Sequence, residues 1–548
     1  MKRALTNFKD FFIKRLLFVG LLCFQFYASA QQDAWVYMVD KENVTASIAN
    51  PITILTQKAI DRKAVHNVAI DERDVPVNES YIAQLKNSTG ITVMAKSKWF
   101  NAVHVRGSQP DIQALENLAF VEHVDFANKS LNTSKAVRKV KVSKFKETYA
   151  MFNYGNASNQ IEMFNGDKLH EAGYTGTGMT VAVLDAGFPN VNTMVAFKRL
   201  RDAGNLKGGY DFVNREDNVY ANTTSNHGTL VLSDMAGYIE NQFVGTAPDA
   251  SYYLFITEDA LSENPVEESY WVEAAERADS LGVDVINTSL GYTTFDNPNY
   301  NYTTSNMDGK TAFITRGANI AFEKGMLLVN SAGNSGNDSW GIVGAPADAA
   351  GVFTVGAVDA SGNYAAFSSR GSALQPTHKP DVVAQGQASY VIFENGAIGT
   401  ANGTSFSSPI MTGGMVCLWQ ALPDKTNAEI MQLARASASQ YEMPDYNLGF
   451  GIPNLELALN IALDEAPKDD SDNLLIYPNP VEASLFVKTA SDNFPITINL
   501  FDILGKQVLQ STLSDPEDVL DVSTLANGIY IVSVFAADIT KTFKLIKK

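Results

Sequence analysis

Cysteine and positive charge are both scarce in this chain. Only two cysteines occur among its 548 residues, and 42 lysines and arginines stand against 60 aspartates and glutamates, a net charge of −18. Because phosphate contacts need a basic face, this balance argues against a nucleic-acid partner. Cys417 lies in the apolar run GGMVCLWQ, where a thiol is usually inert packing, so a cysteine nucleophile is disfavoured.

Long hydrophobic runs are absent beyond the N-terminus. Residues 1–30 combine the basic stretch MKRALTNFKDFFIKR, the apolar stretch LLFVGLLCFQFY and the small residues ASA before QQ, a pattern typical of a secretory signal cleaved after Ala30. A membrane anchor is the alternative, but the apolar stretch is short for a span. Cleavage would also remove Cys23, so we expect a soluble mature chain without an internal disulfide.

Signatures of two other hydrolase classes are missing. No H-E-x-x-H occurs, which disfavours a metal-dependent hydrolase of that type. Ser405 lies in G-T-S-F-S rather than G-x-S-x-G, and none of the six histidines follows it. This excludes the chain order Ser, Asp, His of the α/β-hydrolases.

Composition and periodicity divide the rest of the chain into folded units and linkers. The first unit alternates strand-like and helix-like stretches, as in a small α+β fold with a split β-α-β pattern. The last consists of short alternating strands with turn residues between them, as in an all-β sandwich. We expect a signal peptide at 1–30, an α+β unit at 31–128, a basic linker at 129–152, a central domain at 153–462, an acidic linker at 463–472 and a β-sandwich at 473–548.

The central domain has the pattern of an α/β fold. Short apolar runs such as VAVLD, VDVIN and GMLLVN alternate with helix-like stretches, which predicts a parallel β-sheet covered by helices on both faces. Ligands of such sheets meet the carboxyl ends of the strands. Asp185, Ser289 and Asn334 come at or just after strand ends, which is the first indication of a site.

Ser405 lies where the loop ANGTSFSSP runs into the apolar, helix-like segment IMTGGMVCLWQAL. Turn chemistry would account for it, whereas a nucleophile would need a histidine base and a group that orients this base. His227 is the best-placed histidine, because Gly228 and an apolar helix-like run follow it, although a lone histidine is more often structural. Asp185 is the candidate orienting carboxylate, although it could instead cap the next turn.

The order Asp185, His227, Ser405 is that of the subtilisins. Residues 160–454 resemble the catalytic domain of the subtilisin family: GYTGTGMTVAVLDAGF resembles its Asp segment, NHGTLVLSDMAG its His segment and GTSFSSP its Ser segment, and VGTAPDA, FSSRG and KPDVVA match in order. The resemblance implies a serine endopeptidase with these three catalytic residues and with Asn334 of NSAGNSG in the oxyanion hole. It also implies two substrate-binding segments, formed by Ser289, Leu290, Gly291, Ser331, Ala332 and Gly333.

The chain departs from the family pattern at three points. Ala186 stands where Ser or Thr is commoner, Leu230 where the family often repeats a His, and Phe406 and Ser407 where Met-Ala is usual. None of these removes a reacting group, so they bear on specificity more than on activity. Neither substrate segment is acidic, from which we expect an apolar or aromatic residue before the cut. The insertion at 292–310, rich in Tyr and Asn, forms either a wall or lid of the site or a decorated surface loop.

The two outer units also resemble known parts. Residues 31–128 resemble the subtilase propeptide, an intramolecular inhibitor and folding aid, and a cut near 148–158 would release the enzyme. Residues 473–548, with YPNPV, DILGK, DVSTLANGIYIV and the basic KLIKK end, resemble the C-terminal sorting domain of type IX secretion. A carbohydrate-binding or structural sandwich is the alternative. The sorting domain implies the secretion machinery as a partner and a secreted or outer-surface location.

The sequence therefore predicts a secreted serine endopeptidase that is made as a zymogen, acts on proteins or peptides as a monomer and needs no cofactor for its chemistry. Calcium often stabilises this family, but no compact carboxylate loop stands out as a calcium or other metal site. The alternative is a catalytically inactive subtilase-fold protein that binds or adheres at the cell surface.

Overall fold

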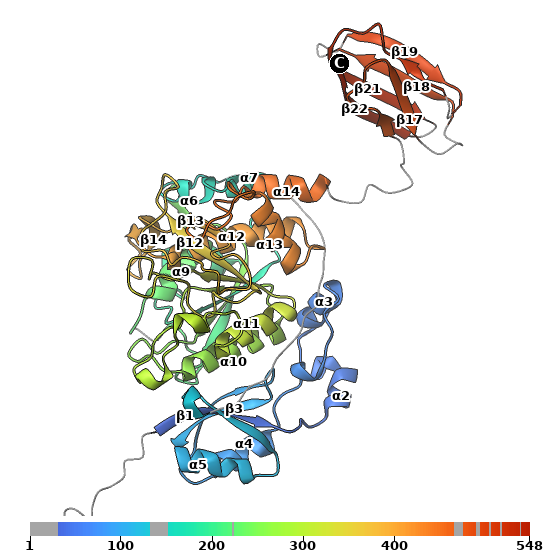
Figure 1. Ribbon diagram of the computed structural model, residues 1–548. Coiled ribbons are helices and arrows are strands. Elements are labelled where there is room, and N and C mark those ends of the chain that lie inside the picture. The colour runs from blue at the N-terminus through green and yellow to red at the C-terminus, as the bar shows by residue number, and fades with distance from the viewer. Residues whose placement is uncertain are drawn as a thin grey trace, which may run out of the picture. The chain divides into compact units, whose positions relative to one another are not determined.

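The structure is a computed structural model that describes residues 31–131, 152–221, 224–464, 475–488, 494–502, 506–515, 518–536 and 539–548 (Figure 1). The chain forms two compact units, one that ends at Ala462 and one that spans Leu463–Lys548. The predicted signal peptide and most of the two predicted linkers lie outside the described residues. In the described part of the chain, no helix is both long and apolar enough to cross a membrane.

The first unit begins with an N-terminal domain, residues 31–131, built on a four-stranded antiparallel sheet. Its elements are β1 (Gln31–Met38), α2 (Val44–Ala49), η1 (Pro51–Thr53), α3 (Gln57–Val65), η2 (Glu72–Asp74), α4 (Glu79–Lys86), β2 (Thr92–Ser97), β3 (Ala102–Ser108), α5 (Gln109–Ala114), η3 (Leu115–Asn117), β4 (Val121–Phe126) and η4 (Lys129–Leu131). The strand order β2-β3-β1-β4 puts β3 between β1 and β2, which confirms the expected split β-α-β pattern.

Strand β1 is buried on both faces. Successive side chains of a strand point to opposite sides. On one side Ala34 and Val36 pack into the core of the N-terminal domain, and on the other Trp35 and Tyr37 pack into a core shared with the central domain. Trp35 stacks on Phe313 of the central domain with ring centroids 4.4 Å apart. The sheet of the N-terminal domain is therefore one layer of a larger packed body.

The central domain, residues 152–462, is built on a seven-stranded sheet in the order β13-β12-β11-β10-β5-β9-β6, and all its strand pairs are parallel. Its elements are α6 (Ser158–Glu162), α7 (Gly166–Glu171), β5 (Thr180–Asp185), η5 (Val195–Phe197), α8 (Lys198–Asp202), β6 (Leu206–Asp211), α9 (His227–Ala236), β7 (Tyr238–Ile239), β8 (Phe243–Val244), β9 (Ser251–Ile256), α10 (Val266–Leu281), β10 (Val285–Thr288), η6 (Pro298–Tyr300), η7 (Thr304–Asn306), α11 (Phe313–Glu323), β11 (Leu327–Ser331), β12 (Val352–Val358), β13 (Val382–Gln385), β14 (Ser389–Ile392), β15 (Ile398–Ala401), α12 (Thr404–Ala421), α13 (Asn427–Ala436) and α14 (Leu455–Asp464).

Helices cover both faces of this sheet, as the continuous apolar runs predict. In β5, Val181 and Val183 pack on the side of α9 and α12, while Ala182 and Leu184 pack on the side of α10 and α11. In Figure 1 the sheet of the N-terminal domain lies beneath α10 and α11, and it shares their core. Helix α12 packs against β10 to β13 and α9, and all its residues except Gln420 are buried. Burial on nearly every side is typical of a central helix.

The second unit consists of two sheets, in the orders β16-β17-β20 and β19-β18-β21-β22. Its strands are β16 (Leu475–Tyr477), β17 (Ser484–Lys488), β18 (Ile496–Phe501), β19 (Gln507–Leu513), β20 (Leu520–Asp521), β21 (Gly528–Ala536) and β22 (Ile539–Lys547). Along β18, Ile496, Ile498 and Leu500 alternate into a buried core that also includes Leu485 and Val532. This alternation confirms the predicted all-β tail.

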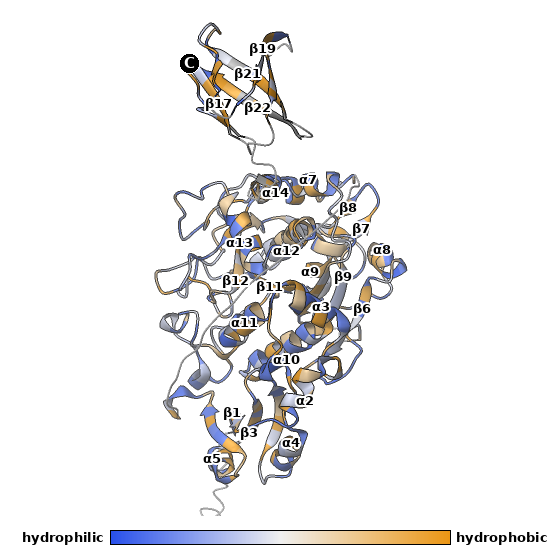
Figure 2. Ribbon diagram, turned by 90° about the vertical axis from the view of Figure 1, so that its right-hand side faces the viewer, coloured by the Kyte–Doolittle hydropathy of each residue, from blue (hydrophilic) through white to orange (hydrophobic). Residues whose placement is uncertain are grey.

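The N-terminal and central domains share a buried network of ion pairs. Asp279 of α10 lies 2.5 Å from Arg62 Nη2 and 2.8 Å from Lys63 Nζ, both on α3. Lys324, which follows α11, lies 2.7 Å from Asp74 of η2. The side chains of Lys63, Asp74, Asp279 and Lys324 are all 0% exposed. In Figure 2, α3 lies beside α10, with hydrophilic positions in blue on both helices.

Charge, rather than burial, decides the protonation of Asp279. Burial alone would raise the pKa of this carboxyl, but the charges of Lys63 and Arg62 outweigh burial and hold the pKa below its usual range. A lowered pKa means that the carboxylate stabilises the folded chain at pH values above about 4, and that this stabilisation is lost as the pH falls through the folded-state pKa.

We predict that Asp279→Ala destabilises the joined N-terminal and central domains by about 3–5 kcal/mol, because it leaves two buried cations without their shared carboxylate. The test is the melting temperature of the full chain by calorimetry, with Ser405→Ala in both samples so that no self-cleavage intervenes. Asp202→Ala is the control, since it removes a carboxylate from an exposed pair with Lys198 and should leave the melting temperature unchanged. Equal melting temperatures for the two variants would contradict the prediction.

Candidate active site

Three neighbouring strands end at one edge of the parallel sheet. Strand β10 pairs with β5 on one side and with β11 on the other. Asp185 is the last residue of β5, Ser289 follows β10 directly, and Ser331 ends β11, three residues before Asn334. The sheet thus brings the predicted strand-end residues to the edge where open α/β sheets bind their ligands.

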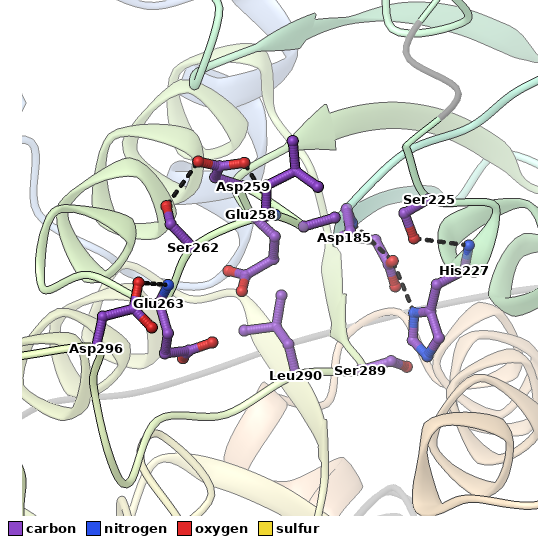
Figure 3. Close-up of a pocket in the computed structure, with 13 residues that line it drawn as sticks. Asp185, Ser225, His227, Glu258, Asp259, Ser262, Glu263, Ser289, Leu290 and Asp296 are labelled. Atoms are coloured by element: carbon purple, nitrogen blue, oxygen red, sulfur yellow. Dashed lines mark hydrogen bonds and ion pairs between the residues drawn. The ribbon is translucent and has the colours of Figure 1, made fainter.

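Asp185 and His227 form a hydrogen bond at this edge, with Asp185 Oδ1 2.8 Å from His227 Nδ1 (Figure 3). The Asp185 side chain is 1% exposed, whereas 36% of the His227 side chain is exposed. His227 opens α9, and a Cβ on Gly228 would lie 2.7 Å from both the Gly187 carbonyl oxygen and a ring carbon of Phe188. Glycine therefore lets α9 approach the turn that follows β5 closely enough for the hydrogen bond to form.

The environment of His227 favours its charged form. Burial alone would lower the pKa of the imidazole, but the charge and the hydrogen bond of Asp185 outweigh burial and raise this pKa above its ordinary value. An ionised carboxylate accepts hydrogen bonds and cannot donate them. Ionised Asp185 therefore fixes the proton of neutral His227 on Nδ1 and leaves Nε2 as the acceptor.

Ser405 is the second residue of α12 and is bound to Ser289 in both directions. The Ser289 hydroxyl donates to the Ser405 carbonyl at 3.0 Å, and the Ser405 hydroxyl donates to the Ser289 carbonyl at 3.2 Å. The Ser405 carbonyl is available because Pro409, four residues further along the helix, has no N–H to donate. Within the described residues, no hydrogen bond joins Ser405 Oγ to His227 Nε2.

Asn334 is fixed by the first residue of α12. Its side-chain oxygen accepts from Thr404 N at 2.9 Å and from Thr404 Oγ1 at 3.0 Å, so its NH₂ group must face the other way. The backbone N–H of Ser405 also lies in the first turn of the helix, where no intrahelical carbonyl can accept it. Both donors flank Gly403: a Cβ built there would lie 3.6 Å from Ser405 N and 3.7 Å from Asn334 Nδ2. The glycine, at φ +154°, keeps open the space between two donors that have no acceptor in the described part of the chain.

The two predicted substrate segments follow β10 and β11 and lie side by side. Asn330 Nδ2 donates to the Leu290 carbonyl at 3.2 Å and so ties one segment to the other. Leu290 is half-buried, and Gly291 is exposed. The segments comprise Ser289, Leu290, Gly291, Ser331, Ala332 and Gly333.

Two departures from the family pattern contact each other. Leu230 of α9 and Phe406 of α12 pack with Val391 in a small apolar cluster. The ring centroid of Phe406 lies 6.1 Å from that of His227. The two helices that carry His227 and Ser405 are therefore joined by an apolar contact beside the site.

The remaining departure, Ala186, leaves one carboxylate oxygen of Asp185 without a hydrogen-bond partner among the described residues. Ala186 donates its backbone N–H to Asp185 Oδ1 at 2.7 Å, but an alanine has no hydroxyl to offer. Asp185 Oδ2 is buried and has no hydrogen-bond partner among the described residues. A buried carboxylate oxygen in this state carries a desolvation cost that a donor from elsewhere would remove.

A cavity of about 520 Å³ lies beside Asp185 and His227 (Figure 3). Four further carboxylates line it, from residues that the sequence analysis missed: Glu258, Asp259, Glu263 and Asp296. Three of the four belong to the segment TEDALSENP, directly after β9, which is the neighbour of β5 in the sheet. Applying the strand-end rule to this segment as well would have pointed to them.

The insertion at 292–310 combines packed tyrosines with exposed polar residues. Tyr292, Tyr300 and Tyr302 are buried in the core that the N-terminal and central domains share. The Tyr300 hydroxyl accepts from the backbone N–H of Asp33 at 3.2 Å, and Asp296 lines the cavity. The insertion thus contributes one residue to the cavity lining and a contact to β1.

Metal binding has no identified place in the described residues, where no group of three His, Cys, Asp or Glu side chains is arranged to hold a metal ion. The expectation of a structural calcium therefore stays without a site.

Three segments of the chain match known families. Residues 33–144 match the peptidase S8 propeptide domain of Bacteroidota, residues 176–451 the subtilase family, and residues 475–548 the secretion system C-terminal sorting domain. Subtilisin E of Bacillus subtilis (strain 168) is 30% identical over 385 residues, which cover 69% of this chain and 90% of that protein. Subtilisin of Bacillus pumilus is 31% identical over 301 residues, 54% of this chain and 97% of that protein.

Among solved structures, MycP1 with its N-terminal propeptide removed is 24% identical and covers 55% of this chain and 96% of that chain, with a TM-score of 0.44. The sorting-domain match indicates export, to the medium or to the outer surface. With a propeptide domain before a seven-stranded parallel sheet, a sorting domain after it and subtilisins among its relatives, the chain belongs to the subtilase family of serine peptidases.

Proposed function

We propose that this chain is a secreted endopeptidase that hydrolyses peptide bonds through an acyl-enzyme, with Asp185, His227 and Ser405 as its triad. The observation that supports this most is the 2.8 Å hydrogen bond between Asp185 and His227, at the sheet edge where Ser405 lies in the first turn of α12. A buried carboxylate that fixes the tautomer of a half-exposed imidazole is what a serine nucleophile requires of its base.

Acylation begins when the Ser405 hydroxyl turns from the Ser289 carbonyl toward His227 Nε2. Hydrogen bonds of this kind are often absent or long before substrate binds. Ser405 Oγ attacks the carbonyl carbon of the peptide while His227 Nε2 takes the hydroxyl proton. His227 then gives this proton to the leaving amine nitrogen as the C–N bond breaks. Asp185 stays ionised and stabilises the imidazolium that forms in between.

Negative charge on the attacked carbonyl oxygen is stabilised by the two donors that flank Gly403. Asn334 Nδ2 and Ser405 N have no acceptor among the residues that the structure describes and are held in place before substrate arrives, so they need no reorganisation during the reaction. Deacylation repeats the sequence with water, whose proton passes to His227 Nε2 as its oxygen attacks the acyl carbon. His227 then returns a proton to Ser405 Oγ as the acyl bond breaks, and the acyl part of the peptide leaves as a carboxylic acid.

The two outer parts of the chain fit a zymogen. The N-terminal domain shares a core and buried ion pairs with the central domain, which supports its role as an intramolecular inhibitor. The boundaries 1–30, 31–128, 129–152, 153–462, 463–472 and 473–548 remain our proposal for the signal peptide, propeptide, processing linker, peptidase domain, second linker and sorting domain. A monomeric enzyme and engagement of the secretion machinery through the tail belong to the same proposal.

A catalytically inactive binding or adhesion protein on the same scaffold is the competing function. The observation on its side is that Ser405 Oγ is bound to the Ser289 carbonyl and not to His227. The experiment on Ser405 decides between the two.

We predict that a serine-directed fluorophosphonate labels the processed protein and that Ser405→Ala abolishes labelling, because Ser405 is the hydroxyl that the proposed triad activates. Ser408→Ala is the matched control on the same helix, since the Ser408 hydroxyl is buried and donates to Asn287 Oδ1, and it should keep labelling. Ser405→Ala should also keep its N-terminal domain attached. Normal processing of the purified variant, or equal labelling of both variants, would contradict the triad.

Asn334→Ala should lower kcat by about 10²–10³ with little change in KM, the loss that follows removal of the oxyanion asparagine from a subtilisin. The reason is that the Asn334 amide meets charge that exists only in the transition state. Steady-state kinetics on a chromogenic peptide would measure it. A loss confined to KM would show that Asn334 binds the ground state instead.

The pH dependence of fluorophosphonate labelling should reflect the pKa of His227 as Asp185 sets it. Because Asp185 raises the pKa of His227 above its ordinary value of about 6.5, the neutral base forms, and fluorophosphonate labelling accelerates, with a midpoint above that value. Asp185→Asn removes the charge, so the midpoint should move to lower pH while the labelling rate falls about 10⁴-fold. A wild-type midpoint well below that ordinary value would refute the assignment of His227 as the base.

A further inference from the structure

We propose that the cavity beside His227 binds a lysine or arginine side chain of the peptide substrate, upstream of the bond that is cut. This inference rests on the proposed peptidase function and assigns it a substrate class. It differs from the apolar preference expected for the residue directly before the cut. That residue enters the slot between the two substrate segments, whereas the cavity lining includes only Ser289 and Leu290 of those segments.

The cavity has acidic walls, and its carboxylates have neutral partners. Glu258 accepts a hydrogen bond from Tyr292, Asp259 accepts from Ser262 Oγ at 2.7 Å, and Asp296 accepts from the backbone N–H of Glu263 at 3.1 Å. Within the described residues, none of the four carboxylates forms an ion pair with a lysine, arginine or histidine.

Asp185 is an independent reason to expect that the cavity binds a positively charged group. Its side chain is 1% exposed, it lines the same cavity, and its Oδ2 has no partner among the described residues. Figure 3 shows its carboxylate between Glu258 and the imidazole of His227. The cavity thus combines an unsatisfied buried carboxylate oxygen with four carboxylates that lack counterions among the described residues, an arrangement whose cost a cation would offset.

The titration behaviour of the walls agrees with this geometry. Burial and the charge of Glu267 raise the pKa of Glu258 well above its usual range. Burial and the charges of Asp296 and Glu268 raise the pKa of Glu263 to about 7. Both shifts express burial beside like charges, and an incoming ammonium or guanidinium would oppose them.

A long cationic side chain suits the site better than a metal ion. In the part of the chain that the structure describes, no three acidic side chains are placed to coordinate one ion. The carboxylates therefore line the cavity without converging on a single coordination position. A cavity of about 520 Å³ is within the usual size of a side-chain or ligand pocket. A peptide that pairs with the exposed edge at Gly291 would carry such a side chain past Leu290 into it.

The chain itself contains a segment of matching chemistry. Residues 132–151, NTSKAVRKVKVSKFKETYAM, contain six lysines or arginines and one glutamate, in a protein with a net charge of −18. This segment lies between the N-terminal and central domains, where maturation requires a cut. We therefore assign its basic side chains as the first occupants of the cavity, and basic segments of other proteins as later ones.

The test uses the full-length chain after it has processed itself, with matched internally quenched peptides. Each pair carries lysine or glutamine at one of the four positions upstream of the cut. We expect the ratio of kcat/KM for lysine over glutamine to reach about tenfold at one position before the residue in the slot, the size of one charge-assisted contact. Glu263→Gln should reduce this ratio about fivefold or more, and Glu263→Lys should invert it in favour of a glutamate peptide.

Glu240→Gln is the control, because Glu240 is an exposed carboxylate outside the cavity lining, and it should keep the wild-type ratio. A wild-type ratio near one at every upstream position, or a ratio unaffected by Glu263→Gln and Glu263→Lys, overturns the inference. Fluorophosphonate labelling of the same samples separates the two levels: a labelled enzyme that cleaves without a basic preference refutes only the pocket. A protein that neither labels nor cleaves refutes the peptidase function and the pocket together.

Discussion

The hydrogen bond between Asp185 and His227 depends on how closely a helix can approach a strand end. The two residues are 42 positions apart in the chain, and the contact forms only because β5 ends at the edge that α9 enters. Gly228 provides the clearance, since any side chain there would strike the turn after β5. The parallel sheet provides the rest, because it puts the ends of β10 and β11 beside that of β5.

At the start of α12, some backbone groups cannot form hydrogen bonds within the helix. Pro409 has no N–H, so the Ser405 carbonyl is free to bind Ser289, and the first-turn N–H of Ser405 has no intrahelical acceptor. Thr404 adds the link to Asn334. In the function we propose, the groups left unsatisfied at this helix terminus serve the reacting serine and the space for the oxyanion.

Much of this could be predicted from the sequence, because local rules sufficed. Continuous apolar runs predicted the parallel sheet, alternation predicted the tail, and the strand-end rule pointed to Asp185, Ser289 and Asn334. The assignment of the triad from Asp185, His227 and Ser405 stays a prediction, although the structure brings Asp185 and His227 together. Contacts between distant segments were not predictable. Nothing in the sequence around Arg62 or Lys63 indicates that they bind Asp279, more than two hundred residues away. The acidic cavity was missed for a different reason, because the strand-end rule was not applied to the segment after β9, whose pairing with β5 brings Glu258 and Glu263 beside Asp185.

Strand β1, with one face for its own domain and one for the central domain, gives maturation a direction. If the N-terminal domain leaves after the proposed cut in the linker, Trp35 and Tyr37 become exposed to water, and so does the ring of Phe313 on which Trp35 stacks. A released N-terminal domain would lose part of the burial that stabilises its fold, and a less stable chain is more easily digested by a protease. Under the proposed function, a molecule that has digested its own inhibitor could not be inhibited by it again, so activation would be irreversible.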